Sequence, residues 1–186
     1  MEFEANCTVP KMIQATAEKY PEIVAQYTKN KSGDFEPITY REMFQKGMDF
    51  GAALLNMGVK REQPIGLISD NRAEWQHADL GLLSIGAIDV PRGCDATIVE
   101  IEKILSITEC EIVIAENNSQ VNKILSIKDK LPVVKKIIHF ENDIKDEVRA
   151  DASSKNVELY YFQDLLVEGQ KWRITNKNVV EEELQK

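Results

Sequence analysis

Short apolar segments alternate with segments of helical periodicity through most of this chain, and this alternation constrains the fold more than any other feature. Strands are expected at 65–69, 87–91, 111–115 and 135–140, and helices between them at about 72–85, 97–108 and 119–128. Strands that alternate with helices are usually joined by right-handed crossovers, so the strands run parallel. The sequence therefore predicts an α/β fold, a largely parallel doubly wound sheet with helices on both faces.

The segment 39–57 has the most complete helix pattern in the chain. Thr39 and Glu42 make a Thr-x-x-Glu capping box at its start, and Gly58 can adopt the left-handed conformation just after its end. Apolar residues recur at three- and four-residue spacing between these ends, and Gly47 and Gly51 lie in the same stripe. This helix is therefore predicted to be a buried structural anchor that packs closely against its neighbours.

The remaining helix starts and the first strands can also be predicted from local residues. Thr97 and Glu100 form a second capping box, Asp70 or Asn71 is the expected cap of the helix at 72–85, and Ser119 that of the helix at 119–128. Near the N-terminus, Thr8 can cap a helix that has Pro10 in its first turn. The segments 23–27 and 35–38 then read as a hairpin joined by the turn 31–34.

Composition limits the class of protein. A chain of 186 residues with 43% hydrophobic and 29% charged side chains is typical of a folded globular domain. The net charge of −8 argues against binding to nucleic acid. Cys7, Cys94 and Cys110 are odd in number and lack metal-site spacing, so we expect reduced thiols in a cytoplasmic protein. The sequence has no apolar run long enough for a transmembrane segment.

The composition changes near residue 140. Residues 141–186 contain 11 acidic and 7 basic side chains, which is half of the net charge in a quarter of the chain. We therefore divide the chain into an α/β subdomain at 1–140 and a polar, acidic extension at 141–186 with a short strand and helices.

Few residues combine into a recognisable chemical site. Asp70 and Asn71 follow an expected parallel strand, where α/β proteins bind ligands, but a helix cap is needed at the same place. His77 and His139 are far apart in sequence and have no histidine partner at metal-ligand spacing. No Ser–His–acid or Cys–His–acid arrangement can be identified from spacing. We therefore assign neither a catalytic residue nor a metal site.

Arg92-Gly93-Cys94-Asp95 is the best local candidate for contact with a ligand. It follows a strand, offers a cation and a glycine, and leads into a capped helix whose free N–H groups can receive an anion. The simpler interpretation is that Gly93 turns the chain and Asp95 closes the turn. Both interpretations remain open on the residues alone.

Four pieces of the sequence together resemble the N-terminal region of the adenylate-forming acyl-CoA synthetases, and are most similar to their long-chain fatty-acid branch. They read Thr-Tyr-x-Glu-Met, Leu-x-x-x-Gly-Val, Asn-x-x-Glu-Trp and Leu-Gly-x-x-x-x-Gly-Ala-x-x-Val-Pro, at 39–43, 54–59, 71–75 and 80–91. Each piece alone consists mostly of residues that serve in cores and turns, so it is a weak match. The specific feature is that all four pieces occur in this order. The resemblance extends more loosely over about residues 8–169.

The resemblance implies an enzyme that uses ATP, Mg²⁺ and coenzyme A to convert a fatty acid to an acyl-adenylate and then to a thioester. It places Gly93, and with it Arg92, on the coenzyme A side, although Cys94 replaces the second glycine of the family's Gly-Gly element. The family's glycine-rich phosphate loop and its later elements are absent from the sequence.

We therefore expect the N-terminal portion of a long-chain fatty-acid–CoA ligase. This portion should be inactive alone, bind none of these cofactors tightly and tend to self-associate. Its partners are the rest of the enzyme and a fatty acid, and the full-length enzyme is cytoplasmic or peripheral to the membrane. The alternative is a free-standing doubly wound module that binds a ligand or a protein and has no adenylation chemistry.

Overall fold

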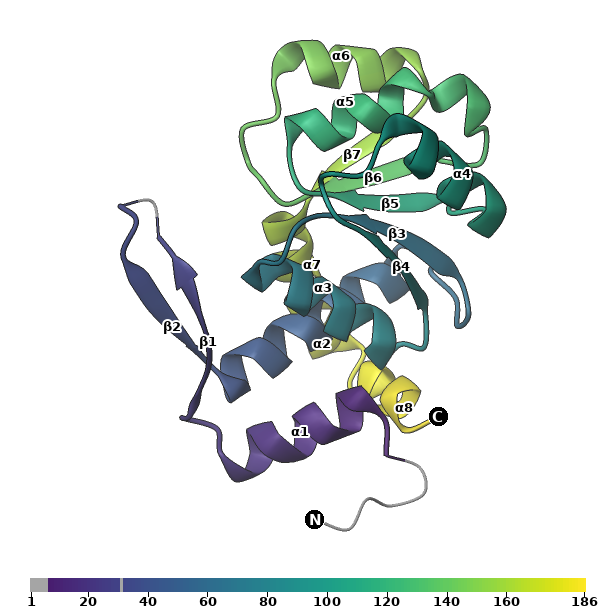
Figure 1. Cartoon of the computed structure of the whole chain (residues 1–186). Coiled ribbons are helices and arrows are strands. Elements are labelled where there is room, and N and C mark those ends of the chain that lie inside the picture. The colour runs from purple at the N-terminus through teal and green to yellow at the C-terminus, as the bar shows by residue number, and fades with distance from the viewer. Residues whose placement is uncertain (1–6, 31) are drawn as a thin grey trace. The chain divides into compact units, whose positions relative to one another are not determined.

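The computed structural model describes residues 7–30 and 32–186, and its chain divides into two compact units. One unit contains the chain up to residue 60 together with 72–86 and 166–186, and the other contains 61–71 and 87–165. Figure 1 shows the elements of both units, which are described separately below.

The unit formed by 61–71 and 87–165 is built on a five-stranded parallel sheet. Its strands are β3 Pro64–Ile68, β4 Ile88–Arg92, β5 Ile112–Ala115, β6 Lys136–His139 and β7 Glu158–Tyr161. Its helices are α4 Ile98–Thr108, α5 Asn118–Ser126, the short 3-10 helix η1 Lys128–Lys130 and α6 Asp146–Ser154.

The spatial order of the strands is β4-β3-β5-β6-β7, and every neighbouring pair is parallel. The chain therefore first moves from β3 to one edge, then crosses to β5 on the other side of β3 and continues outward. This reversal is the defining feature of a doubly wound sheet, and its switch point lies between β3 and β5. The predicted α/β fold with a largely parallel, doubly wound sheet flanked by helices is confirmed.

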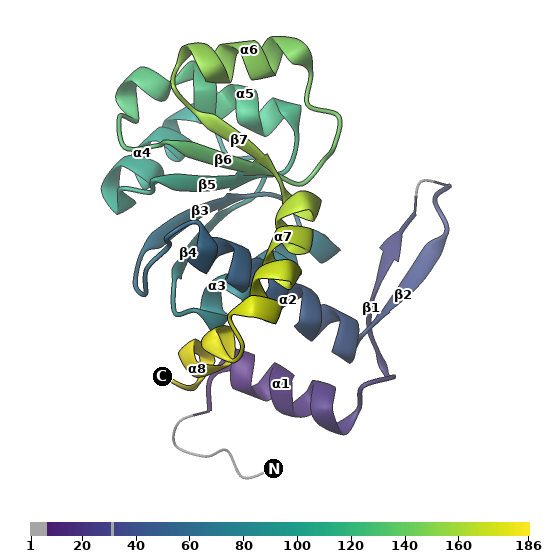
Figure 2. The same ribbon diagram turned by 180° about the vertical axis from the view of Figure 1, so that it is seen from behind.

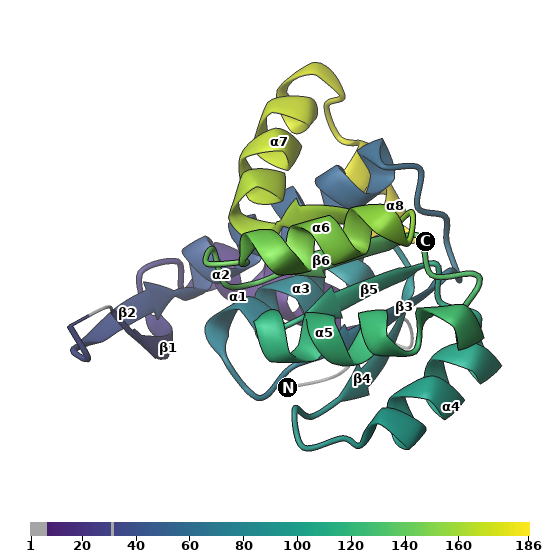
Figure 3. The same ribbon diagram turned by 90° about the horizontal axis from the view of Figure 1, so that it is seen from above.

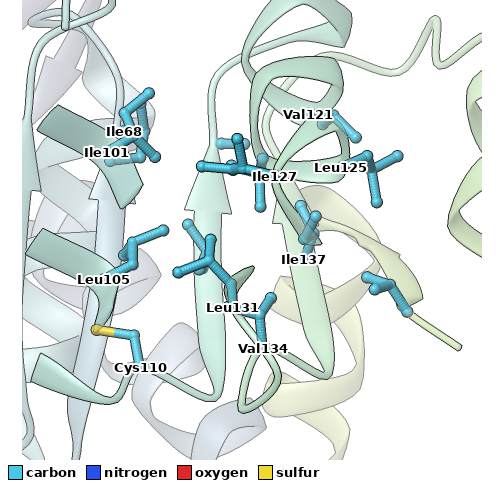
Figure 4. Packing of buried hydrophobic residues seen from close by; sticks show 14 of the residues in the cluster. Ile68, Ile101, Leu105, Cys110, Val121, Leu125, Ile127, Leu131, Val134 and Ile137 are labelled. Carbon is cyan, nitrogen blue, oxygen red and sulfur yellow. The ribbon is translucent and has the colours of Figure 1, made fainter. Parts of the chain in front are cut away.

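One face of the sheet packs against α4, α5 and α6 in a continuous hydrophobic core. Figure 4 shows side chains of this core, and Figure 3 shows α5 between α4 and α6. The sheet contributes Ile68, Val113 and Ile137, the helices contribute residues such as Ile101 and Leu125, and all five are at most 1% exposed. The alternate strand residues, among them those at 65, 67, 114 and 138, are also buried. Burial on both faces explains why these strands read as unbroken apolar runs.

The other unit is mainly helical and includes a hairpin. Its helices are α1 Val9–Lys19, α2 Tyr40–Asn56, α3 Ala73–Ser84, α7 Phe162–Thr175, which enters the unit at residue 166, and α8 Val179–Gln185. β1 Val24–Lys29 pairs antiparallel with β2 Phe35–Thr39, which confirms the predicted hairpin. Lys31, in the predicted turn, lies outside the described residues.

Glycines allow the helices of this unit to approach one another closely. A Cβ atom on Gly81 of α3 would lie 2.8 Å from the backbone oxygen of Gly47 on α2, and a Cβ on Gly51 would lie 3.1 Å from the oxygen of Gly81. Figure 2, the view from behind, shows α7 and α8 in front. Helix α8 contacts α1, α2 and α3. Helix α2 is therefore the packed anchor that its sequence predicts.

Local capping was predicted correctly at three helix ends and wrongly at two helix starts, and Thr8 occupies the N-cap position of α1 without a side-chain cap. Both capping boxes form, at Thr39 and at Thr97, and Gly58 has the left-handed conformation with φ 87°. Helix α3 instead starts after Arg72, which makes no side-chain cap, and α5 is capped by Asn117 rather than by Ser119. Asn117 Oδ1 accepts hydrogen bonds from the backbone N–H groups of Ser119 and Gln120. Neither Asp70 nor Asn71 caps α3, because the chain is still extended at Arg72.

The acidic segment 141–186 contains α6, β7, α7 and α8, and β7 pairs with β6 at the edge of the sheet. As a domain boundary, residue 140 stays a prediction. Among the described residues, no helix combines the length and the apolar character that crossing a membrane requires.

Candidate functional site

The polar residues that follow β3, β4 and β5 come together at the carboxyl edge of the sheet. Asp70 follows β3, Cys94 follows β4 and Glu116 follows β5, and one potential ligand atom from each lies within 4.8 Å of the other two. Carboxyl ends beside a switch point are the usual ligand-binding place of an open α/β sheet. This edge is therefore the candidate functional site of the sheet unit.

The carboxylate of Glu116 bridges the switch point. The Ser69 hydroxyl and the Asp70 backbone N–H both donate to Glu116 Oε2, each at 2.9 Å. The Asn117 side-chain amide donates to the other oxygen, Oε1, at 3.2 Å. Hydrogen bonds to a carboxylate are stronger than those between neutral groups, so Glu116 joins the end of β3 firmly to the end of β5.

Asp70 extends this connection to the loop after β4. Its Oδ1 accepts a hydrogen bond from the Cys94 backbone N–H at 2.9 Å. On the other side of the same loop, Lys123 Nζ donates to the backbone oxygens of Cys94 at 2.8 Å and of Ala96 at 3.1 Å. The loop is thus held by a carboxylate from β3 and by an ammonium group from α5.

The donor set fits a metal ion poorly. Burial, together with the neighbouring negative charges of Glu116 and Asp70, raises the pKa of the Cys94 thiol to about 11. A metal-bound cysteine is a thiolate, so a metal here would have to displace this proton against a raised pKa. Both carboxylates are also committed to hydrogen bonds within the chain. We assign no metal to this cluster.

The structure brings Arg92 and Gly93, the two predicted contact residues, to this edge. Arg92 is the exposed last residue of β4, and its backbone oxygen accepts a hydrogen bond from the Ser69 N–H at 3.0 Å. A Cβ atom on Gly93 would lie 2.7 Å from Asp95 Oδ1 and 3.4 Å from Asp70 Oδ1. Glycine at this position therefore allows the acidic side chains to fold over the loop.

Sequence reasoning missed Glu116 and Lys123. Glu116 makes its bonds to residues 46 and 47 positions earlier, and Lys123 to residues 27 and 29 positions earlier. The available signal for Glu116 was its place directly after an apolar strand, because the carboxyl ends of parallel strands meet at one edge.

The two histidines are held separately by local partners. In the helical unit, His77 is 2% exposed and its Nε2 lies 3.1 Å from Gln26 Nε2 in β1. Burial lowers the pKa of His77 to about 4. In the sheet unit, His139 Nδ1 lies 2.7 Å from the Glu141 backbone oxygen, its ring stacks on Tyr161, and burial lowers its pKa. Neither contact involves a nucleophile that a histidine could activate.

The helical unit contains a polar groove between α2, α7 and α8. Its volume is about 440 Å³, and Arg173 connects its walls, with Nη1 2.6 Å from Asp49 Oδ1 and Nη2 2.8 Å from Glu181 Oε1. Burial raises the pKa of Asp49 against the opposing effect of Arg173. Because the guanidinium group is already paired with two carboxylates, it is not free to recruit an anion.

Comparison with known proteins decides the family. The sequence model of the "AMP-binding enzyme" family matches residues 13–182, which is nearly the whole chain. The chain belongs to this AMP-binding enzyme family. The predicted resemblance to adenylate-forming enzymes is therefore confirmed at the level of the family.

Relatives of this AMP-binding chain include fatty-acid ligases. It is 27% identical over 141 residues to the long-chain-fatty-acid–CoA ligase ACSBG2 of Xenopus laevis, which covers 75% of the chain and 19% of the relative. It is 30% identical over 116 residues to the chloroplastic long-chain-fatty-acid–[acyl-carrier-protein] ligase AEE15 of Arabidopsis thaliana. This match covers 62% of the chain and 16% of the relative. The chain thus spans about a fifth of the length of the curated relatives that it matches.

Solved structures show the same fold. The A-PCP didomain of carboxylic acid reductase from Segniliparus rugosus, in complex with AMP, matches 90% of the chain with a TM-score of 0.74 and 17% identity, over 27% of its own length. The anthranilate CoA ligase AuaEII, in complex with anthranoyl-AMP, matches 90% with a TM-score of 0.74 and 19% identity, over 30% of its length. At these identities the likeness concerns the fold alone.

Proposed function

We propose that this chain is the N-terminal portion of an ATP-dependent long-chain fatty-acid–CoA ligase. The whole enzyme would activate a fatty acid to acyl-AMP and then form the thioester with coenzyme A. The observation that carries the proposal is the family match over residues 13–182, together with relatives that are named as long-chain fatty-acid ligases. We place the whole enzyme in the cytoplasm.

In this reaction the chain would contribute structure rather than catalytic groups, and it would contribute it where coenzyme A, the acceptor of the acyl group, binds. Arg92 and Gly93 are the residues that we propose face coenzyme A, since they lie at the carboxyl edge of the sheet with an exposed cation and a compact backbone. The residues present do not fit ATP and Mg²⁺. The sequence has no glycine-rich phosphate loop, and the carboxylates of Asp70 and Glu116 are committed to internal hydrogen bonds. We therefore derive no step at the phosphates from this chain.

The test compares two proteins, the 186-residue chain and the same chain joined to the coding sequence that follows residue 186. ATP–pyrophosphate exchange with palmitate and Mg²⁺ measures adenylation, and thioester formation with coenzyme A measures the transfer. The longer protein should catalyse both, and the 186-residue chain should show no more exchange than a boiled sample. Exchange by the short chain, or none by the longer one, would contradict the proposal. A stop codon directly after residue 186 would favour the free-standing module.

One observation favours a second candidate for the acceptor of the acyl group. The Arabidopsis relative at 30% identity is named as a ligase that uses acyl-carrier protein. We therefore include a carrier protein bearing a phosphopantetheine thiol as the alternative acceptor in the same assay. If the enzyme prefers the carrier protein to coenzyme A, the proposed adenylation step stands, and the acceptor of the acyl group is the carrier protein instead.

A further inference from the structure

The switch point of this sheet, which a ligand normally occupies, is bridged by a carboxylate of the chain itself. Glu116 Oε2 accepts two hydrogen bonds from the end of β3, and Oε1 accepts a third from Asn117. Three hydrogen bonds use much of the accepting capacity of this carboxylate. An exposed cation is nevertheless present at this edge, since Arg92 lies at the start of the loop after β4.

We propose that Glu116 and Asp70 are positioning residues that set the conformation of the loop 92–94 for the phosphate-bearing thiol acceptor of the reaction. This inference rests on the proposed function, which places Arg92 and Gly93 on the coenzyme A side. It adds two carboxylates that touch neither the acceptor nor ATP and that act through the loop.

The connection runs through two consecutive hydrogen bonds. Glu116 fixes the backbone of Asp70 by accepting its N–H, and Asp70 in turn fixes the loop by accepting the Cys94 N–H. Lys123 holds the opposite side of the loop through the backbone oxygens of Cys94 and Ala96. Loss of the Glu116 side chain leaves the Ser69 N–H bonded to the Arg92 oxygen but removes the acceptor of the Asp70 N–H, and so loosens one of the two side-chain attachments of the loop.

Such fixed attachment matters for a ligand with a flexible chain. A loop that is already held in its binding conformation loses less conformational entropy when the ligand binds. The exposed Arg92 supplies a donor for a phosphate group, while Gly93 lets the carboxylates of Asp95 and Asp70 lie close over the loop and fix its path. Both features require a defined path of the loop.

The first test uses the 186-residue chain. Amide hydrogen exchange of Cys94 and Asp70 is compared in Glu116→Ala, Glu116→Gln and Asp129→Ala. Glu116→Ala should accelerate both amides about tenfold or more, as the loss of a hydrogen bond to a charged group predicts. Glu116→Gln retains an acceptor oxygen and should restore much of the protection. Asp129 is an exposed aspartate on η1 and serves as the matched control. Unchanged exchange of the Cys94 amide in Glu116→Ala overturns the proposal.

Asp70 gives an independent variant in case Glu116→Ala does not fold. Asp70 is exposed, so its replacement leaves no buried cavity. Asp70→Ala should expose the Cys94 amide to exchange, and Asp70→Asn should protect it again through the amide oxygen. Equal protection of this amide in both variants would contradict the assigned role of Asp70.

The second test uses the chain joined to its following coding sequence. Glu116→Ala should raise the KM for coenzyme A, by up to about 100-fold if the loop is misplaced by an ångström. ATP–pyrophosphate exchange should stay within about twofold, because the loop is not placed at the phosphates. A general structural defect would lower both reactions together and would count against positioning. If wild type forms no thioester, the proposed function fails, while amide exchange still decides whether the two carboxylates hold the loop.

Discussion

The replacement Gly169→Ala tests most directly how the helical unit is held together. A Cβ atom at Gly169 of α7 would overlap the backbone oxygen of Asp49 on α2 and would lie 3.0 Å from the backbone nitrogen of Ala53. These are backbone atoms in the middle of a helix, so they cannot rotate away. Ordinary contact begins near 3.4 Å, so α7 would have to move away from α2 to admit a Cβ atom at this position.

The displacement sets the expected magnitude. Alanine favours a helix over glycine by about 1 kcal/mol, which partly offsets the clash. Overpacking alone typically costs about 1–3 kcal/mol, and a shift of α7 would also stretch the 2.6 Å pair between Arg173 and Asp49. We expect the clash itself to cost an amount at the upper end of the overpacking range. After the offset from alanine, the net loss of unfolding free energy should be about 2 kcal/mol or more.

Urea unfolding followed by far-UV circular dichroism measures this loss as a lower midpoint. Gly47→Ala is the matched control, because its Cβ would meet the flexible side chain of Leu80 at 2.7 Å rather than backbone. The control should lose less stability than Gly169→Ala. An unfolding midpoint for Gly169→Ala equal to or above that of wild type would show that α7 does not pack against α2 in this way.

Three further expectations follow from the helix caps, from His77 and from the exposed apolar side chains. Thr39→Ala and Thr97→Ala each remove a capping box and should lower the unfolding free energy by about 1 kcal/mol, measured by urea titration. The pKa of His77 is about 4 in the folded protein, against an ordinary value of 6.5. The stability that the neutral histidine contributes is therefore complete above pH 6.5 and is lost as the pH falls toward 4. The whole loss is roughly 3 kcal/mol. The free energy of unfolding of wild type should therefore fall more between pH 7.5 and 5 than that of His77→Gln, and equal pH dependence would contradict this. Tyr27 and Phe35 of the hairpin are 63% and 66% exposed, so light scattering should detect self-association that Tyr27→Ser weakens, and a wild-type monomer would contradict this.

The parts of the fold that depend on neighbouring residues could be predicted from the sequence. The capping boxes at Thr39 and Thr97 need only a glutamate three residues later, and the hairpin and the apolar strands are also local patterns. The start of α3 was predicted to within a residue but its cap was not, because the Asp70 carboxylate accepts from the Cys94 N–H, 24 residues away. A cap prediction cannot include a competing partner that only the folded sheet supplies. The order of the strands is likewise a property of the assembled sheet.

The candidate site shows the same division between local and distant interactions. Arg92 and Gly93 could be proposed from the sequence because a strand, a turn and a helix start follow one another along the chain. Glu116 was missed because its only local signal is its place directly after an apolar strand, while its bonds to Ser69 and Asp70 reach 47 and 46 residues back along the chain. The proposed contact residues thus lie in a recognisable segment, while the residues that hold this segment follow other strands. Amide exchange in the Glu116 variants addresses this second group directly, because it measures the loop itself and does not depend on which acceptor the whole enzyme uses.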